Sequence, residues 1–189
     1  MIYSKYLKRF LDFLIALIVL ILFFWLIALI GLAILITDGR PVVFTQNRVG
    51  QYGKPFKIYK FRTMVKNAES IGPKATKSGD PRITPIGQIL RKTSLDELAQ
   101  LFNILKGDMS LVGFRPGVPE NYEQADYKSG IFNVKPGITG YAQVNGRSSL
   151  TLEQKRAWEI KYVKDISLIT DFKIIISTIL VVLTKKGTN

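Results

Sequence analysis

The sequence predicts a mainly helical α+β protein, in which a membrane-embedded N-terminal segment precedes one small domain with a β-hairpin and amphipathic surface helices. Three patterns predict this fold class. An uncharged apolar run extends from Phe13 to Ile36, two extended segments follow between Val42 and Met64 with alternation over Lys57–Arg62, and helical spacing of apolar residues returns after Ser94. Residues 1–38 are therefore expected to form a membrane anchor, and residues 39–189 a single domain.

The composition limits the chemistry that this domain can perform. The chain of 189 residues has no cysteine and no histidine, which excludes disulfides, thiolate or histidine-ligated metal sites and His-based triads. Carboxylates thus become the leading candidates for an acid, a base or a nucleophile. The net charge of +13 favours phosphate-bearing partners, with lipid headgroups and nucleotides ahead of nucleic acid.

The apolar run from Phe13 to Ile36 is long enough to cross a bilayer. As a straight helix it would measure about 36 Å, against a hydrocarbon core of about 30 Å. Basic residues flank it on both sides: Lys5, Lys8 and Arg9 before it, and Arg40, Arg48, Lys54 and Lys57 after it. Basic flanks tend to stay on the cytoplasmic side of a membrane. A helix that crosses once keeps only one flank on that side, whereas a helix that bends back keeps both there. Gly31 is the one helix-bending residue available, so the residues alone leave both arrangements open.

The first part of the domain is predicted to form a β-hairpin. Two extended segments, Val42–Val49 and Pro55–Met64, are joined by the turn residues from Gly50 to Gly53. Basic and aromatic side chains mix in the second segment, which suits a strand that faces phosphate or a membrane surface. The polar stretch from Val65 to Pro85 contains several Gly and Pro residues and predicts a mobile loop.

Three later segments carry helical periodicity. Leu95–Leu105 has an apolar stripe, and Ser94 with Glu97 matches the pattern of a capping box. Leu152–Val163 and Asp171–Thr184 follow as further helices. The last has an apolar run too short to span a bilayer, so it either lies on the membrane surface or packs in the core.

Asp96 and Glu97 are the strongest candidates for chemistry. At the first turn of a helix, unpaired N–H groups and the helix dipole favour an anion, although acidic residues also occur there simply as stabilisers. Arg91 precedes the pair and Arg115 follows the predicted helix. Guanidinium groups clamp phosphate, and a carboxylate beside such a clamp can attack a phosphoryl group when a divalent cation screens the repulsion. Covalent aspartyl-phosphate chemistry is therefore physically available.

Short motifs occur in a characteristic order along the chain. They are Lys8-Arg9 with Asp12, Phe44-Thr45-Gln46-Asn47-Arg48, Lys60-Phe61-Arg62-Thr63-Met64, Leu95-Asp96-Glu97-Leu98, Leu105-Lys106-Gly107-Asp108-Met109-Ser110, Gly113-Phe114-Arg115-Pro116, and Pro136-Gly137-Ile138-Thr139-Gly140 with Ala142-Gln143-Val144-Asn145-Gly146-Arg147. With these motifs in register, the sequence resembles the bacterial sugar transferase family, the small monotopic phosphoglycosyl transferases. The resemblance covers nearly the whole chain.

The resemblance implies transfer of a sugar 1-phosphate from a UDP-sugar to polyprenyl phosphate, with release of UMP and a requirement for Mg²⁺. It implies Asp96 as the nucleophile and Glu97 as its helper with Mg²⁺ or the acceptor's proton, so both carboxylates are candidate metal ligands. Candidate substrate-binding residues are Lys60, Arg62, Arg91, Arg115, Gln143, Asn145 and Arg147. The implied location is the cytoplasmic face of the bacterial inner membrane, at the first membrane step of glycoconjugate assembly, with membrane lipids and no nucleic acid as partners.

Members of that family hold a re-entrant helix, which a Ser-Pro pair breaks near its middle. The corresponding positions here are Phe24 and Trp25, so the usual breaker is missing. Together with the resemblance, the basic flanks still favour a re-entrant hairpin over a spanning helix. Lys8, Arg9 and Asp12 match the family in full, and a Lys8–Asp12 pair across one helical turn is their simpler interpretation.

A hypothesis from another class stays open on the residues alone. It is a non-catalytic membrane-bound scaffold whose basic face binds anionic lipid or nucleic acid, and it predicts salt-sensitive binding without turnover. The acidic pair between Arg91 and Arg115 favours the enzyme. The motifs specify neither the sugar nor the oligomeric state.

Overall fold

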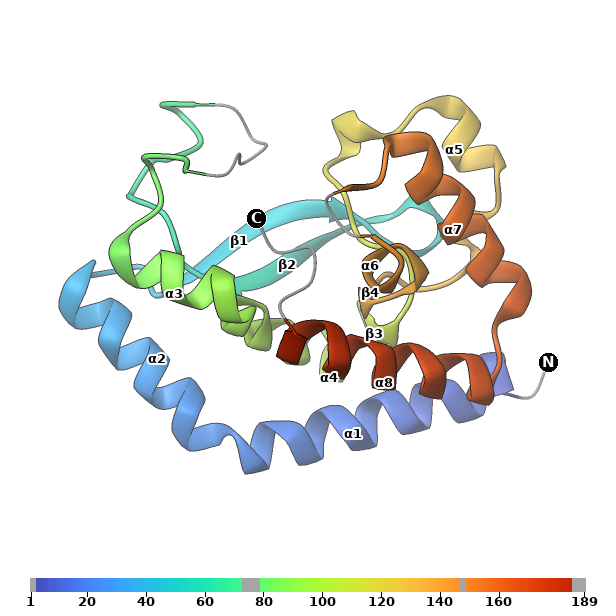
Figure 1. The fold of residues 1–189 in the computed structure, drawn as a ribbon, viewed down its shortest axis with the longest axis horizontal. Coiled ribbons are helices and arrows are strands. Elements are labelled where there is room, and N and C mark those ends of the chain that lie inside the picture. The colour runs from blue at the N-terminus through green and yellow to red at the C-terminus, as the bar shows by residue number, and fades with distance from the viewer. Residues whose placement is uncertain (1–2, 73–78, 147–148, 185–189) are drawn as a thin grey trace.

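Two helices that meet at an angle form the N-terminal segment in the computed structural model, which describes residues 3–72, 79–146 and 149–184. A π-helical turn, Tyr3–Leu7, leads into α1 (Lys8–Leu22), and α2 (Phe24–Thr37) follows. The bend between α1 and α2 is 65° and is visible along the lower edge of Figure 1. Within the described ranges, no single helix is long and apolar enough to cross a membrane, and α1 with α2 meets that criterion as a bent pair.

The bend falls at Phe23, next to the predicted Phe24-Trp25 position, and needs no proline. Phe23 has φ −104° and ψ 13°, outside the helical region. The two arms pack against different parts of the domain: Ala16 of α1 joins one hydrophobic cluster, and Ile30 and Ile34 of α2 join another. Tertiary packing can therefore impose a bend for which the local sequence has no breaker.

The predicted hairpin is confirmed. β1 (Val43–Val49) and β2 (Pro55–Phe61) pair antiparallel, and Gln51–Gly53 form the turn between them. Ile58 of β2 lies in the α1 cluster and Phe61 in the α2 cluster. A single strand thus connects both arms of the bent pair.

The segment around the acidic pair differs from the prediction. In place of one helix over Leu95–Leu105, the chain forms a 3₁₀ segment (Leu95–Gln100) and then α4 (Leu101–Lys106). The predicted capping box is wrong, because Ser94 adopts a left-handed conformation (φ 58°, ψ 17°) and its side chain makes no capping hydrogen bond. The physical reason is a preceding helix that ends at Thr93, so the chain must turn sharply at Ser94.

That preceding helix, α3 (Pro85–Thr93), was not predicted. Its start does have a sequence pattern: the Thr84 hydroxyl accepts from the Gly87 N–H at 3.1 Å, and proline occupies the first helical position. The loop predicted just before it, from Val65 to Pro85, lies partly outside the described residues. Its described ends are held together, since the Val65 N–H donates to the Arg82 carbonyl oxygen at 2.9 Å.

Glycine-rich segments form a second pair of strands, which are parallel and were not predicted. β3 (Ser110–Val112) pairs with β4 (Gly137–Thr139). A β-carbon on Gly137 would lie 2.1 Å from the Gly113 nitrogen, and one on Gly140 would lie 2.0 Å from the Gly113 oxygen. The close approach of the two chains therefore requires glycine at these positions. β3 leads directly toward Arg115.

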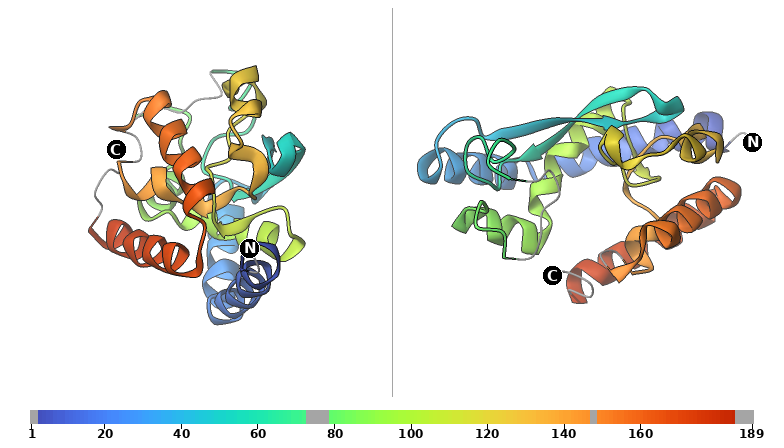
Figure 2. Two further views of the ribbon diagram at one scale, coloured as in Figure 1. Left: turned by 90° about the vertical axis from the view of Figure 1, so that its right-hand side faces the viewer. Right: turned by 90° about the horizontal axis from the view of Figure 1, so that it is seen from above.

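Helices and short 3₁₀ turns cover the rest of the domain. They are Pro119–Asn121, α5 (Gln124–Lys128), Ile131–Asn133, α6 (Tyr141–Val144), α7 (Leu152–Asp165) and α8 (Leu168–Thr184). α7 and α8 confirm the two predicted C-terminal helices. Seen from above, they lie along the side of the molecule opposite to the β1–β2 hairpin (Figure 2).

Helix α8 packs in the core on one face and exposes apolar side chains on another, so core packing is confirmed and contact with a membrane surface stays a prediction. Ile174 is buried in a cluster with Val112 and Tyr162. The other face of the helix exposes a continuous apolar set: Leu168, Ile169, Phe172, Ile176, Ile179, Leu180 and Val182. In Figure 1 α8 lies on the same side of the molecule as α1 and α2.

A buried polar network joins the start of α1 to α8. The Lys8 ammonium lies 3.9 Å from Asp12, as predicted for an i,i+4 pair, but only 2.5 Å from Asp171. The Tyr162 hydroxyl donates to Asp171 at 2.8 Å, and Asp12 accepts from the Ser110 hydroxyl at 2.7 Å. Lys8 and Asp12 therefore hold together elements that are far apart in the chain.

Arg9 caps α4 from the neighbouring helix. Its guanidinium donates to the carbonyl oxygens of Ile104 and Leu105, at 2.9 Å in the second case. These carbonyls belong to the last turn of α4, which carries the negative end of the helix dipole. The Ile104 oxygen also accepts from the Gly107 N–H at 3.0 Å. Arg9 thus fixes α1 against α4.

Candidate active site

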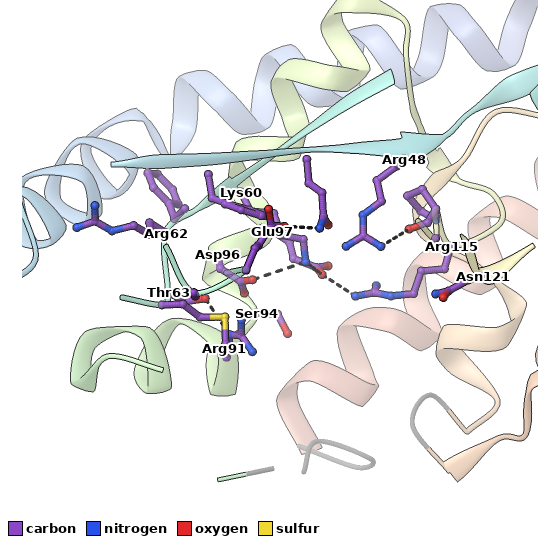
Figure 3. A pocket seen from close by; sticks show the side chains of 18 of the residues that line it. Arg48, Lys60, Arg62, Thr63, Arg91, Ser94, Asp96, Glu97, Arg115 and Asn121 are labelled. Atoms are coloured by element: carbon purple, nitrogen blue, oxygen red, sulfur yellow. Dashed lines mark hydrogen bonds and ion pairs between the residues drawn. The ribbon is translucent and has the colours of Figure 1, made fainter. Parts of the chain in front are cut away.

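A cleft of about 920 Å³ opens between the hairpin, the 3₁₀ segment, the loop after β3 and the first turns of α7. Asp96 and Glu97 line it together. Figure 3 shows the two carboxylates between Arg91 on one side and Arg48 and Arg115 on the other. The chain therefore brings acidic and basic side chains from four separate segments into one place.

Glu97 holds the two nearest cations. Lys60 Nζ and a terminal nitrogen of Arg115 each lie 2.8 Å from the same oxygen, Oε1 of Glu97. Burial by itself would raise the pKa of Glu97, but the charges of Arg115 and Lys60 outweigh it and hold that pKa well below its usual value. Glu97 is therefore ionised and engaged at neutral pH.

Asp96 is buried, but unlike Glu97 it has no cation within hydrogen-bond distance. Its side chain makes no hydrogen bond to a described residue, and its nearest cation, Lys60 Nζ, lies 3.7 Å away. Burial raises the pKa of Asp96, and the charge of Lys60 opposes this rise. The Asp96 carboxylate thus faces the cleft without a close partner.

Arg91 and Arg62 take different positions although both line the cleft. Arg91 Nε donates to the Thr63 hydroxyl at 2.8 Å, and its charge acts on Asp96. The Arg62 guanidinium points away from the carboxylates (Figure 3) and donates to the carbonyl oxygens of Asp38 and Gly39, at 2.6 and 2.8 Å. The structure therefore brings Arg91 to the acidic pair and places Arg62 against the end of α2.

Of the candidates Gln143, Asn145 and Arg147, the structure places only Gln143 in the lining of the cleft among the described residues. Gln143 lines the cleft with only 8% of its surface exposed, and neither its Nε2 nor its Oε1 has a hydrogen-bond partner among the described residues. Asn145 is exposed, lies outside the cleft lining and donates to the Tyr141 carbonyl oxygen at 2.9 Å. Arg147 lies outside the described residues.

Three hydrogen bonds hold the loop that carries Arg115. Its backbone N–H donates to Glu159 of α7 at 3.2 Å, its carbonyl oxygen accepts from the Tyr122 hydroxyl at 3.2 Å, and that hydroxyl accepts from the Gly117 N–H at 2.9 Å. Arg156 stacks over the Tyr122 ring, 4.1 Å from its centroid, and donates to Glu159 at 2.9 Å. Helix α7 therefore positions Arg115.

Sequence reasoning assigned no site role to Arg48 or to any residue of α7. The Arg156–Glu159 spacing on a predicted helix was a usable signal, because residues three apart meet on one helical face. Arg48 belongs to the Phe44–Arg48 motif, but nothing in the neighbouring sequence connects it with Asp96. The fold alone brings β1 and α7 to the cleft.

Asp96 and Glu97 supply the carboxylate oxygens that would hold a magnesium ion in the cleft. Mg²⁺ in phosphoryl-transfer sites is bound by one or two carboxylates, and substrate phosphates and water complete its shell. Both cations donate to Oε1 of Glu97, which leaves Oε2 without a described partner. Nowhere in the described ranges do three or more acidic side chains form a cluster suited to a metal, so substrate and water would supply the other ligands.

A comparison with protein-family models identifies the chain. The model described as bacterial sugar transferase matches residues 3–185. The chain belongs to the bacterial sugar transferase family. The match extends from the π-helical turn before α1 to just beyond α8, so the bent helix pair and the cleft both fall within the family's common region.

Curated relatives of this sugar transferase carry related names. It is 41% identical over 193 residues to the galactosyl transferase CpsE of Streptococcus agalactiae, covering 95% of this chain and 43% of the relative. It is 39% identical over 186 residues to the UDP-glucose:undecaprenyl-phosphate glucose-1-phosphate transferase of Escherichia coli, covering 93% and 40%. It is 43% identical over 150 residues to the uncharacterized sugar transferase EpsL of Bacillus subtilis, covering 79% and 73%. The chain thus spans less than half the length of the first two.

Proposed function

We propose that this sugar transferase moves a sugar 1-phosphate from a UDP-sugar to undecaprenyl phosphate or a similar polyprenyl phosphate, releasing UMP, through a covalent intermediate on Asp96. The names of relatives at about 40% identity support the donor and acceptor classes. The product is a polyprenyl-diphosphate sugar, which begins the assembly of a surface glycan.

The observation that carries this proposal is the unequal use of two adjacent carboxylates. Glu97 takes both nearby cations at 2.8 Å, whereas Asp96 faces the cleft with its nearest cation at 3.7 Å. A nucleophile must keep a lone pair free for attack. Glu97 thus holds the positive charge in place, and Asp96 keeps its oxygens available.

The proposed reaction has two displacement steps. An Asp96 oxygen forms a bond to the sugar-bound phosphorus, and the bond from that phosphorus to the bridging oxygen breaks, so that UMP leaves with the electron pair. An oxygen of polyprenyl phosphate then attacks the same phosphorus and the bond to Asp96 breaks, which regenerates the carboxylate. Lys60, Arg91 and Arg115 offset the negative charge in both steps.

Glu97 and the proposed magnesium act by charge rather than by bonding to phosphorus. Bound at Asp96 and Glu97, Mg²⁺ would screen the repulsion between the diphosphate and the carboxylate. Glu97 itself keeps Lys60 and Arg115 directed toward the reacting phosphate. Removal of divalent ions with a chelator should abolish turnover, and addition of Mg²⁺ should restore it.

The bent helix pair supports a place at the cytoplasmic face of the bacterial inner membrane. A 65° bend between α1 and α2 suits a hairpin that enters the bilayer and returns, because both basic flanks then stay on one side. The apolar face of α8 would rest on the same surface. The cleft would then open where a membrane-borne phosphate is presented.

The hairpin topology can be tested by labelling, because the chain has no cysteine of its own. Single cysteines replace Ile2 and Arg40 in separate variants, and a membrane-impermeant maleimide is added to right-side-out or inverted vesicles. Both positions should react in inverted vesicles only. If one position reacts only in right-side-out vesicles and the other only in inverted vesicles, the helix spans the membrane instead.

The proposed activity is tested with the purified chain, Mg²⁺, undecaprenyl phosphate and a panel of UDP-sugars. UMP should be released from at least one UDP-sugar. Release should exceed one UMP per protein molecule only when undecaprenyl phosphate is present. A scaffold of the second class would bind anionic vesicles in a salt-sensitive manner and release no UMP from any member of the panel.

Replacement of Lys60 with Met should shift the acid limb of the pH–rate profile to higher pH. Attack on phosphorus requires the ionised form of Asp96. Burial raises the pKa of Asp96 and the charge of Lys60 lowers it. Loss of the Lys60 ammonium therefore raises the pKa of Asp96 further. The measurement is kcat/KM for the UDP-sugar against pH. Lys57→Met, on the exposed side of the same strand, is the matched control, and an unmoved acid limb in Lys60→Met would refute the coupling.

A further inference from the structure

Gln143 is a buried amide whose hydrogen-bonding capacity the fold leaves unused. It lines the cleft, 8% of its surface is exposed, and both polar atoms of its side chain lack a hydrogen-bond partner among the described residues. A glutamine amide offers two N–H donors and an oxygen that accepts. Burial of such a group without partners costs free energy. Gln143 therefore has the properties of a side chain that waits for a ligand.

The backbone holds Gln143 in the part of the cleft next to Arg115. Its N–H donates to the Gly140 carbonyl oxygen at 3.0 Å. A β-carbon on Gly140 would lie 3.1 Å from Oε1 of Gln143 and 2.0 Å from the Gly113 oxygen, so the amide lies beside the close contact of these two glycines. Gly113 begins the loop that carries Arg115, whose guanidinium donates to Glu97 at 2.8 Å. The amide thus belongs to the neighbourhood of the acidic pair.

The order of groups in a UDP-sugar indicates which part the amide meets, and this step rests on the proposed function. The transferred sugar is bonded directly to the phosphorus that Asp96 attacks, whereas uracil lies beyond the second phosphate and the ribose. Cationic side chains already serve the diphosphate: Lys60, Arg91 and Arg115. A neutral amide close to the reacting phosphorus is therefore suited to the uncharged group next to it, which is the sugar.

Hydroxyl groups match this amide better than the edge of a base does. A hydroxyl both donates and accepts, so it can pair with the amide in either of its two orientations. The edge of uracil presents donor and acceptor in a fixed order, and its recognition needs an amide whose orientation the protein fixes. No described residue fixes the orientation of the Gln143 amide by a hydrogen bond.

We propose that Gln143 is a specificity-determining residue that binds hydroxyl groups of the transferred sugar. It distinguishes UDP-sugars that carry a hydroxyl at the contacted position from those that lack it, because an absent hydroxyl leaves the buried amide unpaired. UMP lacks the transferred sugar and does not engage Gln143.

The first test compares turnover with nucleotide binding in the full chain in nanodiscs. Gln143→Met, a change of similar volume, should lower kcat/KM for the fastest UDP-sugar of the panel by about 10-fold, as expected for loss of one or two neutral hydrogen bonds. UMP binding, measured by calorimetry, should change less than about twofold. Gln124→Met, at an exposed position of α5, is the matched control and should leave both quantities unchanged.

Monodeoxy analogues of the same UDP-sugar identify the contacted hydroxyl without any need for UMP binding. In the wild type, removal of that hydroxyl should lower kcat/KM by about 10-fold or more. Gln143→Met should use that analogue and the parent UDP-sugar about equally, because the contact is already absent. Such a coupling between variant and analogue is the signature of a direct interaction, which a merely structural role of Gln143 would not produce.

Thermal unfolding without ligand separates ligand binding from folding. Because the amide has no described partner, Gln143→Met should be as stable as the wild type or more stable. A less stable or unfolded variant would show that the fold itself uses the amide, and would overturn the proposal.

Three other outcomes would also overturn it. They are unchanged kcat/KM in Gln143→Met, equal losses in kcat/KM and UMP affinity, which would move the contact to uracil or ribose, and a set of deoxy analogues that fails to distinguish the variant from the wild type. A wild type that releases no UMP from any UDP-sugar would instead refute the proposed function. Normal release by the wild type together with any of the three outcomes would refute the role of Gln143 alone.

Discussion

Replacement of Asp96 with Asn should reduce sugar 1-phosphate transfer by at least about 10³-fold. An amide has nearly the same shape as the carboxylate but does not attack phosphorus, so the first displacement is lost while the cleft is retained. The measurement is UMP release, combined with mass spectrometry of protein quenched after mixing with the UDP-sugar. The wild type should carry a sugar-phosphate adduct on the Asp96 peptide, and Asp96→Asn should carry none.

The same variant separates a chemical role from a structural one. Because burial raises the pKa of Asp96, the ionised form is disfavoured in the folded state, and removal of the charge should leave thermal stability at neutral pH equal to or above that of the wild type. Glu153→Gln, an exposed change in the first turn of α7, should keep activity within about twofold. Activity of Asp96→Asn within tenfold of the wild type, or an adduct on another residue, would reject Asp96 as the nucleophile.

Replacement of Asp171 with Ala should destabilise the fold by about 3–5 kcal/mol, the usual cost of leaving one member of a buried ion pair alone. Lys8 lies 2.5 Å from Asp171 and is 8% exposed, so without the carboxylate its charge stays buried, and among the described carboxylates Asp12, at 3.9 Å, is left to compensate. Tyr162 would also lose an acceptor at 2.8 Å. The free energy of unfolding is measured by denaturant titration of the protein in detergent micelles.

Two further variants test whether the ion pair is the cause. The double change Lys8→Met with Asp171→Leu removes both charges and should recover most of the lost stability, since a buried pair is often replaceable by apolar residues. Lys173→Ala, on the exposed side of the same helix, should stay within about 0.5 kcal/mol of the wild type. A double variant no more stable than Asp171→Ala would argue for packing rather than charge.

Elements with a local cause were predictable from the sequence. Alternation and a glycine turn located the hairpin, and apolar periodicity located α7 and α8. The β3–β4 pair had no such signal, because short strands from distant segments meet through the close contact of Gly113 and Gly137. The left-handed Ser94 likewise follows from where α3 ends and the 3₁₀ segment begins, which a capping pattern alone does not reveal.

The candidate site divides in the same way. Asp96, Glu97, Lys60 and Arg115 were chosen from motifs, and the structure brings them within reach of one another. Arg62 was a substrate-binding candidate like Lys60 and lay within the predicted extended segment Pro55–Met64, but β2 ends at Phe61, so Arg62 leaves the pleat and turns toward Asp38. Arg48 and the Arg115-holding residues of α7 arrive by tertiary folding, and spacing along the chain does not indicate them.

The two clusters that β2 shares with α1 and α2 have a practical consequence for protein engineering. Ala16 completes one cluster, and Ile30 and Ile34 complete the other, so residues 1–38 supply part of the interior of residues 39–189. Excision of the N-terminal segment, or its exchange for an unrelated transmembrane helix, would expose Ile58 and Phe61 on either side of Lys60. A soluble fragment that begins after residue 38 is therefore expected to aggregate, and productive truncation must keep both arms.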